Sequence, residues 1–127
     1  MNNITVSLEM AKKLKEAGWK KETELKWYIN RLFPAHLRFR NEVQREIDDT
    51  FLAYAPTAEE ILRELPDHLL KNGIKRRITI DISDNRVDKN KYGIFYGSGG
   101  ELYTVYGDTL ANAAAQMYCH LSTNNLL

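Results

Sequence analysis

The sequence predicts a single α+β domain built on an antiparallel β-sheet of about four strands, with three helices packed mainly on one face. Two observations carry this prediction. Apolar residues recur at helical spacing near the start, middle and end of the chain, and they alternate with polar residues over 74–82. Helical and strand-like segments do not alternate as βαβ units do, which favours an antiparallel sheet. The 127 residues fit one domain, spanning 1–127, that needs no metal or disulfide to fold.

The first predicted helix spans residues 8–17. Ser7 is a suitable N-cap because its hydroxyl can accept a hydrogen bond from a free backbone amide of the first turn. Gly18 stands where a left-handed residue often ends a helix. Between them lies an apolar stripe at helical spacing, made of Leu8, Ala11, Leu14 and Ala17.

The second and third predicted helices also have recognisable starts. Thr57 and Glu60 match a capping box, in which each side chain bonds to the backbone amide of the other residue. Pro66 ends this helix, and we expect residues 67–72 to add one further turn. Asp108 or Thr109 caps the last helix, whose apolar stripe consists of Leu110, Ala113, Ala114, Met117, Tyr118 and Leu121.

The clearest predicted strand spans residues 74–82. One parity predicts a buried face made of Ile74, Ile78, Ile80 and Ile82. The other parity carries Arg77, Thr79, Asp81 and Ser83, which predict a face in contact with water. Two further strands are predicted from aromatic and β-branched runs at 92–96 and 101–106, joined by a glycine-rich hairpin turn at 97–100.

The segment between the first two helices is harder to interpret. Alternating apolar residues predict a strand at 23–30. We favour a helix for 37–47, while a strand at 38–45 paired with the first one is the alternative. Residues 51–55 are expected to form a short strand.

Basic and acidic blocks alternate along a chain whose formal net charge is +1. The charge balance is +4 over 1–47, −5 over 48–68, +4 over 69–91 and −2 over 92–127. A strong nucleic-acid-binding protein usually has an overall basic excess, which is missing here. The single cysteine, Cys119, excludes an internal disulfide, and no apolar stretch has the length of a signal peptide or a membrane span. We therefore expect a soluble, cytoplasmic protein with no membrane association.

Three helix-forming blocks of the sequence resemble a known group of proteins. They are ITVSLEMAKKLKEAG at 4–18, APTAEEILRELP at 55–66 and GDTLANAAAQM at 107–117. Together they cover about a third of the chain and resemble a family of small bacteriophage- and prophage-encoded proteins of unknown function. The resemblance implies an accessory role in the cytoplasm of a bacterial host cell. It implies no activity, cofactor or catalytic residue, because the family has none established.

The residues that could carry catalysis or bind a metal are scattered. The spacing of the three histidines, His36, His68 and His120, is not that of a metal site. Cys119 adjoins only His120, and adjacent side chains on a helix point in different directions, so the two would not form a nucleophile–base pair. Acidic residues follow the isoleucine strand, but the spacing of Asp81, Asp84 and Asp88 matches no EF-hand loop. The glycines at 97–100 lead into a strand and not into a helix, which argues against a phosphate cradle. We therefore predict no catalytic residue, no metal site and no cofactor.

The remaining candidates are residues that could bind a macromolecule. Basic residues cluster at 38–45 and 71–77, and tyrosines follow in the predicted hairpin. The candidate contact residues are Lys75, Arg76, Arg77, Tyr92, Tyr96 and Tyr103. We predict a non-enzymatic protein that binds another macromolecule, with a host or phage protein as the favoured partner. Nucleic-acid binding through the basic segments is the alternative, and self-association through a sheet edge is a further expectation.

Overall fold

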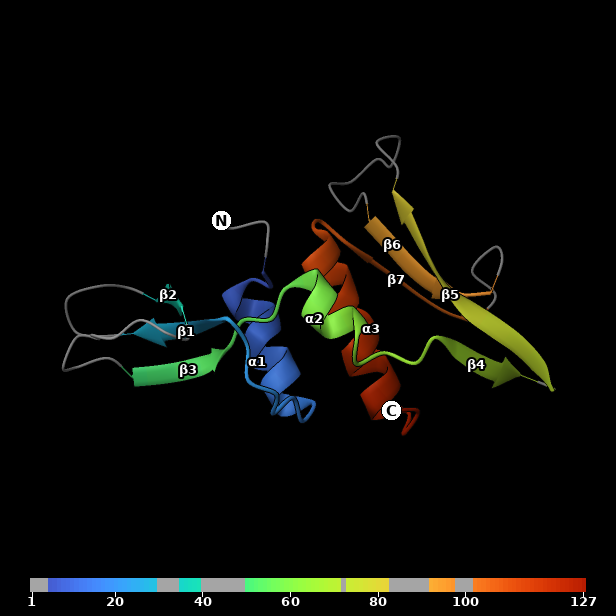
Figure 1. Cartoon of the computed structure of the whole chain (residues 1–127), viewed down its shortest axis with the longest axis horizontal. Helices are drawn as coiled ribbons and strands as arrows, with labels where there is room; N and C mark the ends of the chain where they lie inside the picture. The colour runs from blue at the N-terminus through green and yellow to red at the C-terminus, as the bar shows by residue number, and fades with distance from the viewer. Residues whose placement is uncertain (1–4, 30–34, 40–49, 72, 83–91, 98–101) are drawn as a thin grey trace.

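The computed structural model of the chain describes residues 5–29, 35–39, 50–71, 73–82, 92–97 and 102–127. Within these residues it contains three helices and seven strands (Figure 1). The predicted α+β class is confirmed. The described strands form two antiparallel sheets, one of four strands and one of three, which the sequence did not separate.

The three helices begin where their capping residues predict. In α1 (Leu8–Glu16) the Ser7 Oγ accepts a hydrogen bond from the Met10 amide at 3.3 Å. In α2 (Ala58–Leu62) both halves of the Thr57–Glu60 capping box are formed. In α3 (Leu110–Thr123) the N-cap is Thr109, so the choice between Asp108 and Thr109 is settled by the structure.

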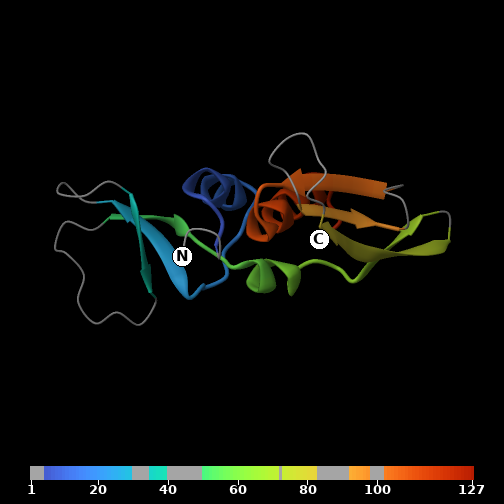
Figure 2. The ribbon, with the colours of Figure 1, turned by 90° about the horizontal axis from the view of Figure 1, so that it is seen from above.

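The helices occupy the middle of the molecule and the two sheets lie at its two ends (Figures 1 and 2). Both sheets contribute to one hydrophobic core. Leu14 of α1, Ile61 of α2 and Met117 of α3 are buried in it. They are joined there by Ala53 from the three-stranded sheet and Ile94 from the four-stranded sheet. The chain therefore closes a single interior although its strands are divided.

The three-stranded sheet has the order β2-β1-β3, with β1 at Leu25–Ile29, β2 at His36–Phe39 and β3 at Thr50–Tyr54. The predictions of a strand at 23–30 and of a short strand at 51–55 are confirmed within a residue or two. The helix that we favoured for 37–47 is wrong over its first residues. These residues pair with β1, as in the alternative, because backbone pairing and cross-strand contacts override a weak helical stripe. The remainder, residues 40–49, lies outside the described residues.

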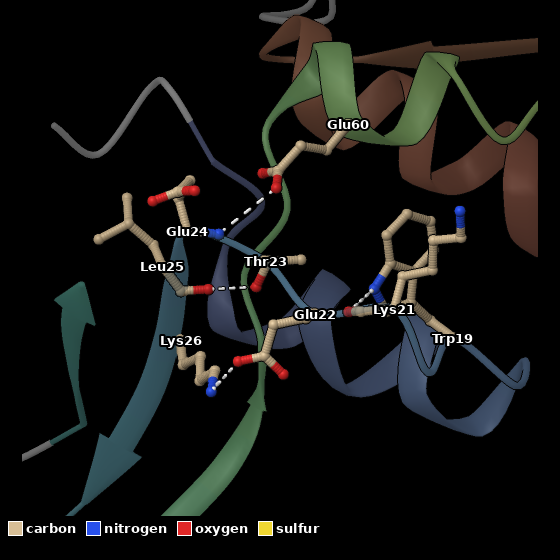
Figure 3. Close-up of polar contacts among 8 residues, drawn as sticks. All are labelled: Trp19, Lys21, Glu22, Thr23, Glu24, Leu25, Lys26 and Glu60. Atoms are coloured by element: carbon tan, nitrogen blue, oxygen red, sulfur yellow. Dashed lines mark hydrogen bonds and ion pairs between the residues drawn. The ribbon is translucent and has the colours of Figure 1, made fainter. Parts of the chain in front are cut away.

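Polar contacts fix the connection that leads from α1 into β1 (Figure 3). The Trp19 indole N–H donates to the Lys21 carbonyl at 3.0 Å, and the buried Thr23 hydroxyl donates to the Leu25 carbonyl. The Glu24 amide donates to the Glu60 carboxylate at 3.4 Å. Because the other oxygen of Glu60 caps α2, this single carboxylate ties the start of β1 to the start of α2.

The four-stranded sheet has the order β4-β5-β6-β7, with β4 at His68–Lys71, β5 at Ile74–Ile82, β6 at Tyr92–Tyr96 and β7 at Leu102–Gly107. The helical turn predicted over 67–72 is wrong, because most of it is β4, paired with β5. The hairpin strands at 92–96 and 101–106 are confirmed within a residue. Helix α3 packs on β6 and β7, where its buried alanines allow a close approach.

The predicted burial of the isoleucine strand is wrong for most of its length. Ile78 is half buried against the core, but Ile74, Ile80 and Ile82 are 55%, 43% and 62% exposed. Their parity was predicted correctly, since all four side chains lie on the face of the sheet that carries α3. The physical reason for their exposure is that α3 covers that face only over β6 and β7, and β5 lies beyond the helix (Figure 1).

Candidate functional site

The three histidines lie apart in the structure, and Cys119 adjoins only His120. His36 accepts a hydrogen bond from Arg38 in β2, and His68 bonds to the adjacent Asp67 carboxylate at 2.8 Å. On α3 the His120 ring contacts the Tyr103 ring, with centroids 4.7 Å apart. Burial raises the pKa of the neighbouring Cys119 thiol, which disfavours the thiolate that nucleophilic chemistry needs. The described groups therefore form no nucleophile–base pair.

The acidic residues of the isoleucine strand do not form a metal site within the described residues. Asp81 is exposed on the face of β5 opposite α3, while Asp84 and Asp88 fall outside the described residues. The described parts of the chain contain no group of three His, Cys, Asp or Glu residues close enough to hold a metal ion. Of the turn at 97–100, only Gly97 is described, and its φ of +96° suits the end of β6.

The predicted contact residues are distributed over both faces of the four-stranded sheet. Lys75 and Arg77 are exposed on the face opposite α3, whereas Arg76 is half buried on the other face. Tyr96 is fully buried, and its hydroxyl donates to the Pro66 carbonyl at 2.7 Å. Tyr92 and Tyr103 are half buried and pack against the core. Of the six residues, the structure brings only Lys75 and Arg77 together on one exposed surface.

One exposed apolar surface of the described chain consists of residues that sequence reasoning placed in the core. We call it the isoleucine face and define it as the side chains of Ile74, Ile80 and Ile82 on β5. Ile80 and Ile82 are consecutive on this side of β5, and Ile80 lies opposite the buried Ile94 of β6. Ile74 lies on the same side, beyond the half-buried Arg76 and Ile78. Isolated exposed apolar residues are common, whereas exposed apolar residues that gather on one side of a strand are typical of a binding surface. The alternating pattern in the sequence could have found these residues, although not their exposure.

Two hollows lie elsewhere on the described surface. An open groove of about 430 Å³ runs beside Cys119 and His120 on α3. A cavity of about 340 Å³ lies between α1 and β3, with Trp19, Phe51 and Tyr54 in its wall. The Lys15 ammonium at this cavity donates to the Leu52 carbonyl at 3.1 Å and lies 5.7 Å from the centre of the Phe51 ring. That lysine is thus already used to hold α1 against β3.

Comparisons with protein-family models, with curated proteins and with solved structures find no match to this chain. None of the described helices combines the length and the apolar character that a membrane span requires. The functional argument therefore rests on the surface chemistry of the chain itself.

Proposed function

We propose that this protein is a non-enzymatic accessory protein of the bacteriophage type, and that it acts by binding another protein through the isoleucine face. The observation that supports this function is the exposure of Ile74, Ile80 and Ile82 on one side of β5. A partner that covers these side chains removes their aliphatic area from water. This burial contributes about 25 cal/mol per Å² to the free energy of binding, before the costs of association are subtracted. A protein partner fits better than a polyanion, because these side chains have no group that bonds to phosphate.

The experiment is a capture of partners from a bacterial lysate with three forms of the tagged protein. These are the wild type, the triple variant I74T/I80T/I82T and the double variant K75T/R77T, which changes the opposite face of the same strand. We expect a protein that is captured by the wild type and by K75T/R77T and is lost with the triple variant. Titration calorimetry of the purified pair should then show a negative heat-capacity change, as burial of apolar area requires. Equal capture by the triple variant would contradict the proposal, provided that circular dichroism shows it folded.

Nucleic-acid binding is the second candidate, and it is favoured by the opposite face of the same sheet. There Lys75 and Arg77 are exposed beside a cross-strand row of Thr79, Phe95 and Thr104, with Tyr106 also exposed. Basic side chains next to aromatic rings on a sheet are typical of single-strand binding. Asp81 lies in the same row as Tyr106, where its carboxylate would repel phosphate.

An anisotropy titration with a labelled single-stranded oligonucleotide tests the second candidate. Binding that weakens steeply with salt and is reduced in K75T/R77T would support it. We expect affinity no greater than that of a neutral control protein.

A further inference from the structure

Strand β5 changes its pairing partner halfway along its length. Residues Ile74 to Arg77 pair with β4, and residues Ile78 to Ile82 pair with β6 on the other side. No described strand pairs with the β4-side edge of β5 beyond Ile78. The reason lies at Pro66, which connects α2 to β4. At this residue the chain turns away from β5, and the Pro66 carbonyl accepts a hydrogen bond from the Tyr96 hydroxyl.

Two hydrogen bonds show which backbone groups point to this edge. The Ile78 amide donates to the Asp67 carbonyl at 3.0 Å, on the β4 side. The Arg77 carbonyl accepts from the Gly97 amide at 2.8 Å, on the β6 side. In an antiparallel strand the N–H and C=O of one residue point to the same side, and successive residues alternate. The N–H and C=O groups of Ile80 and Ile82 therefore point to the β4-side edge.

The same two residues supply most of the isoleucine face. Ile80 and Ile82 thus present outward-pointing backbone donors and acceptors together with exposed aliphatic side chains. A row of unpaired strand groups is a template for another strand, and apolar side chains on alternate residues give such pairing its affinity. The chemistry that satisfies both requirements at once is an extended polypeptide.

We infer that an extended segment of the partner protein pairs along the Ile80–Ile82 edge as an added strand in line with β4. This inference rests on the proposed function. Its apolar side chains, on alternate residues, cover Ile80 and Ile82. The partner residues between these apolar positions point to the other face of the sheet, on which Asp81 lies. Lysine or threonine is favoured at those positions, because it can interact with the Asp81 carboxylate across the two strands.

A second copy of this chain fits the edge less well. A symmetric pairing centred on Asp81 sets two carboxylates opposite each other, which is destabilising. Moving the centre to Ile80 brings the incoming strand against Asp67, whose carbonyl already occupies the Ile78 amide. A partner segment of different sequence meets neither obstacle.

The test is backbone hydrogen exchange by NMR, with the capped peptide acetyl-Thr-Val-Lys-Val-Lys-Val-Thr-amide as the probe. In the free protein, we expect the amides of Ile80 and Ile82 to exchange faster than those of Thr79 and Asp81, which bond to β6. Excess peptide should slow exchange at Ile80 and Ile82 by at least about tenfold and leave Thr79 and Asp81 unchanged.

Two substitutions at the same position separate strand pairing from side-chain contact. Ile82→Pro removes an outward amide that takes no part in the pairing with β6, and proline is tolerated at such edge positions. We expect Ile82→Pro to abolish the slowing of amide exchange that the peptide causes at Ile80. Ile82→Thr should keep this slowing and only weaken peptide binding by a few-fold. If the proline variant does not fold, exchange in the wild type alone decides.

Three outcomes would overturn the inference. Slow exchange at Ile80 and Ile82 in the free, dilute protein would mean that the edge is already covered. Peptide-induced changes confined to the isoleucine methyl groups, or no response to the peptide, would reject strand addition while leaving the capture experiment to decide the proposed function. Protection that rises with protein concentration in the absence of peptide would assign the edge to self-association.

Discussion

Ile80 and Ile94 are direct cross-strand neighbours on the same face of the same sheet, yet Ile94 is 0% exposed and Ile80 is 43% exposed. The difference arises from α3, which packs extensively on β6 and β7 but not on β5. The sheet therefore has a covered half, β6 and β7, and a second half, β4 and β5, on which α3 does not pack although Leu69 and Ile78 still reach the core. We call this second half the uncovered half. This comparison teaches that alternation in a strand identifies residues that share a face, whereas burial depends on what packs against that face.

The largest expected effect on stability is the difference between the variants Ile94→Ala and Ile80→Ala. Removing a fully buried isoleucine leaves a cavity, so the free energy of unfolding should fall by about 2–5 kcal/mol. The same truncation at Ile80 should lower it by less than about 1.5 kcal/mol, because this side chain is already partly hydrated. Urea denaturation of both variants measures the difference, and equal losses would mean that something covers β5 in solution.

A second prediction concerns the distance between α3 and the covered half. A Cβ atom added at Gly107 would lie 2.6 Å from the Ala113 amide nitrogen, so Gly107→Ala forces the start of α3 away from β7. We expect a loss of about 1–3 kcal/mol in the free energy of unfolding.

The matched control for that substitution lies in the uncovered half. At Gly73 an added Cβ meets nothing within 4 Å, and only the positive φ of +78° opposes it. Gly73→Ala should therefore cost about 1 kcal/mol. Thermal unfolding of both variants checks the order, and a larger loss at Gly73 would contradict close packing of α3.

A smaller effect is expected from Tyr96→Phe. The buried Tyr96 hydroxyl donates to the Pro66 carbonyl and so links the covered half to the turn where the chain enters β4. Its pKa is raised, chiefly because burial disfavours the charged phenolate. Loss of the hydroxyl should reduce the free energy of unfolding by about 1 kcal/mol and speed amide exchange in β4. A substitution that leaves exchange in β4 unchanged would show that this bond does not hold the uncovered half in place.

The smallest effect belongs to the exposed Asp67–His68 pair at the start of β4. The hydrogen bond from His68 lowers the pKa of the Asp67 carboxyl below its ordinary value of 3.8. A carboxyl with a lowered pKa in the folded state adds stability above its ordinary value, and this stability is lost as the pH falls through the lowered pKa. Asp67→Asn should thus lower the unfolding temperature slightly near neutral pH and have no effect in strong acid. An equal difference at every pH would assign the effect to something other than this ionisation.

Much of the secondary structure could be predicted because its signals are local. The Ser7 cap, the Thr57–Glu60 capping box and the apolar stripe of α3 act within one or two turns, and all three helices begin where these signals place them. Strands β6 and β7 follow from aromatic and β-branched runs on either side of a glycine-rich turn.

The wrong predictions concern segments whose structure depends on a distant partner. Residues 36–39 form a strand because β1 lies beside them, and residues 68–71 form a strand because β5 lies beside them. Neither segment carries enough local preference to decide between helix and strand. The candidate surface was missed for a similar reason, since the isoleucines of β5 look like core residues when read along the chain alone.

The sequence by itself determined where each helix begins and that the isoleucines of β5 share one side of the sheet, because capping and side-chain periodicity act over a few residues. It did not determine where α2 ends, since this helix stops at Leu62 and not at Pro66. Tertiary structure alone decided that the strands divide between two sheets, and that α3 stops short of β5 and leaves its aliphatic side chains in water. That outcome depends on how far one helix extends across one sheet, which no local pattern encodes.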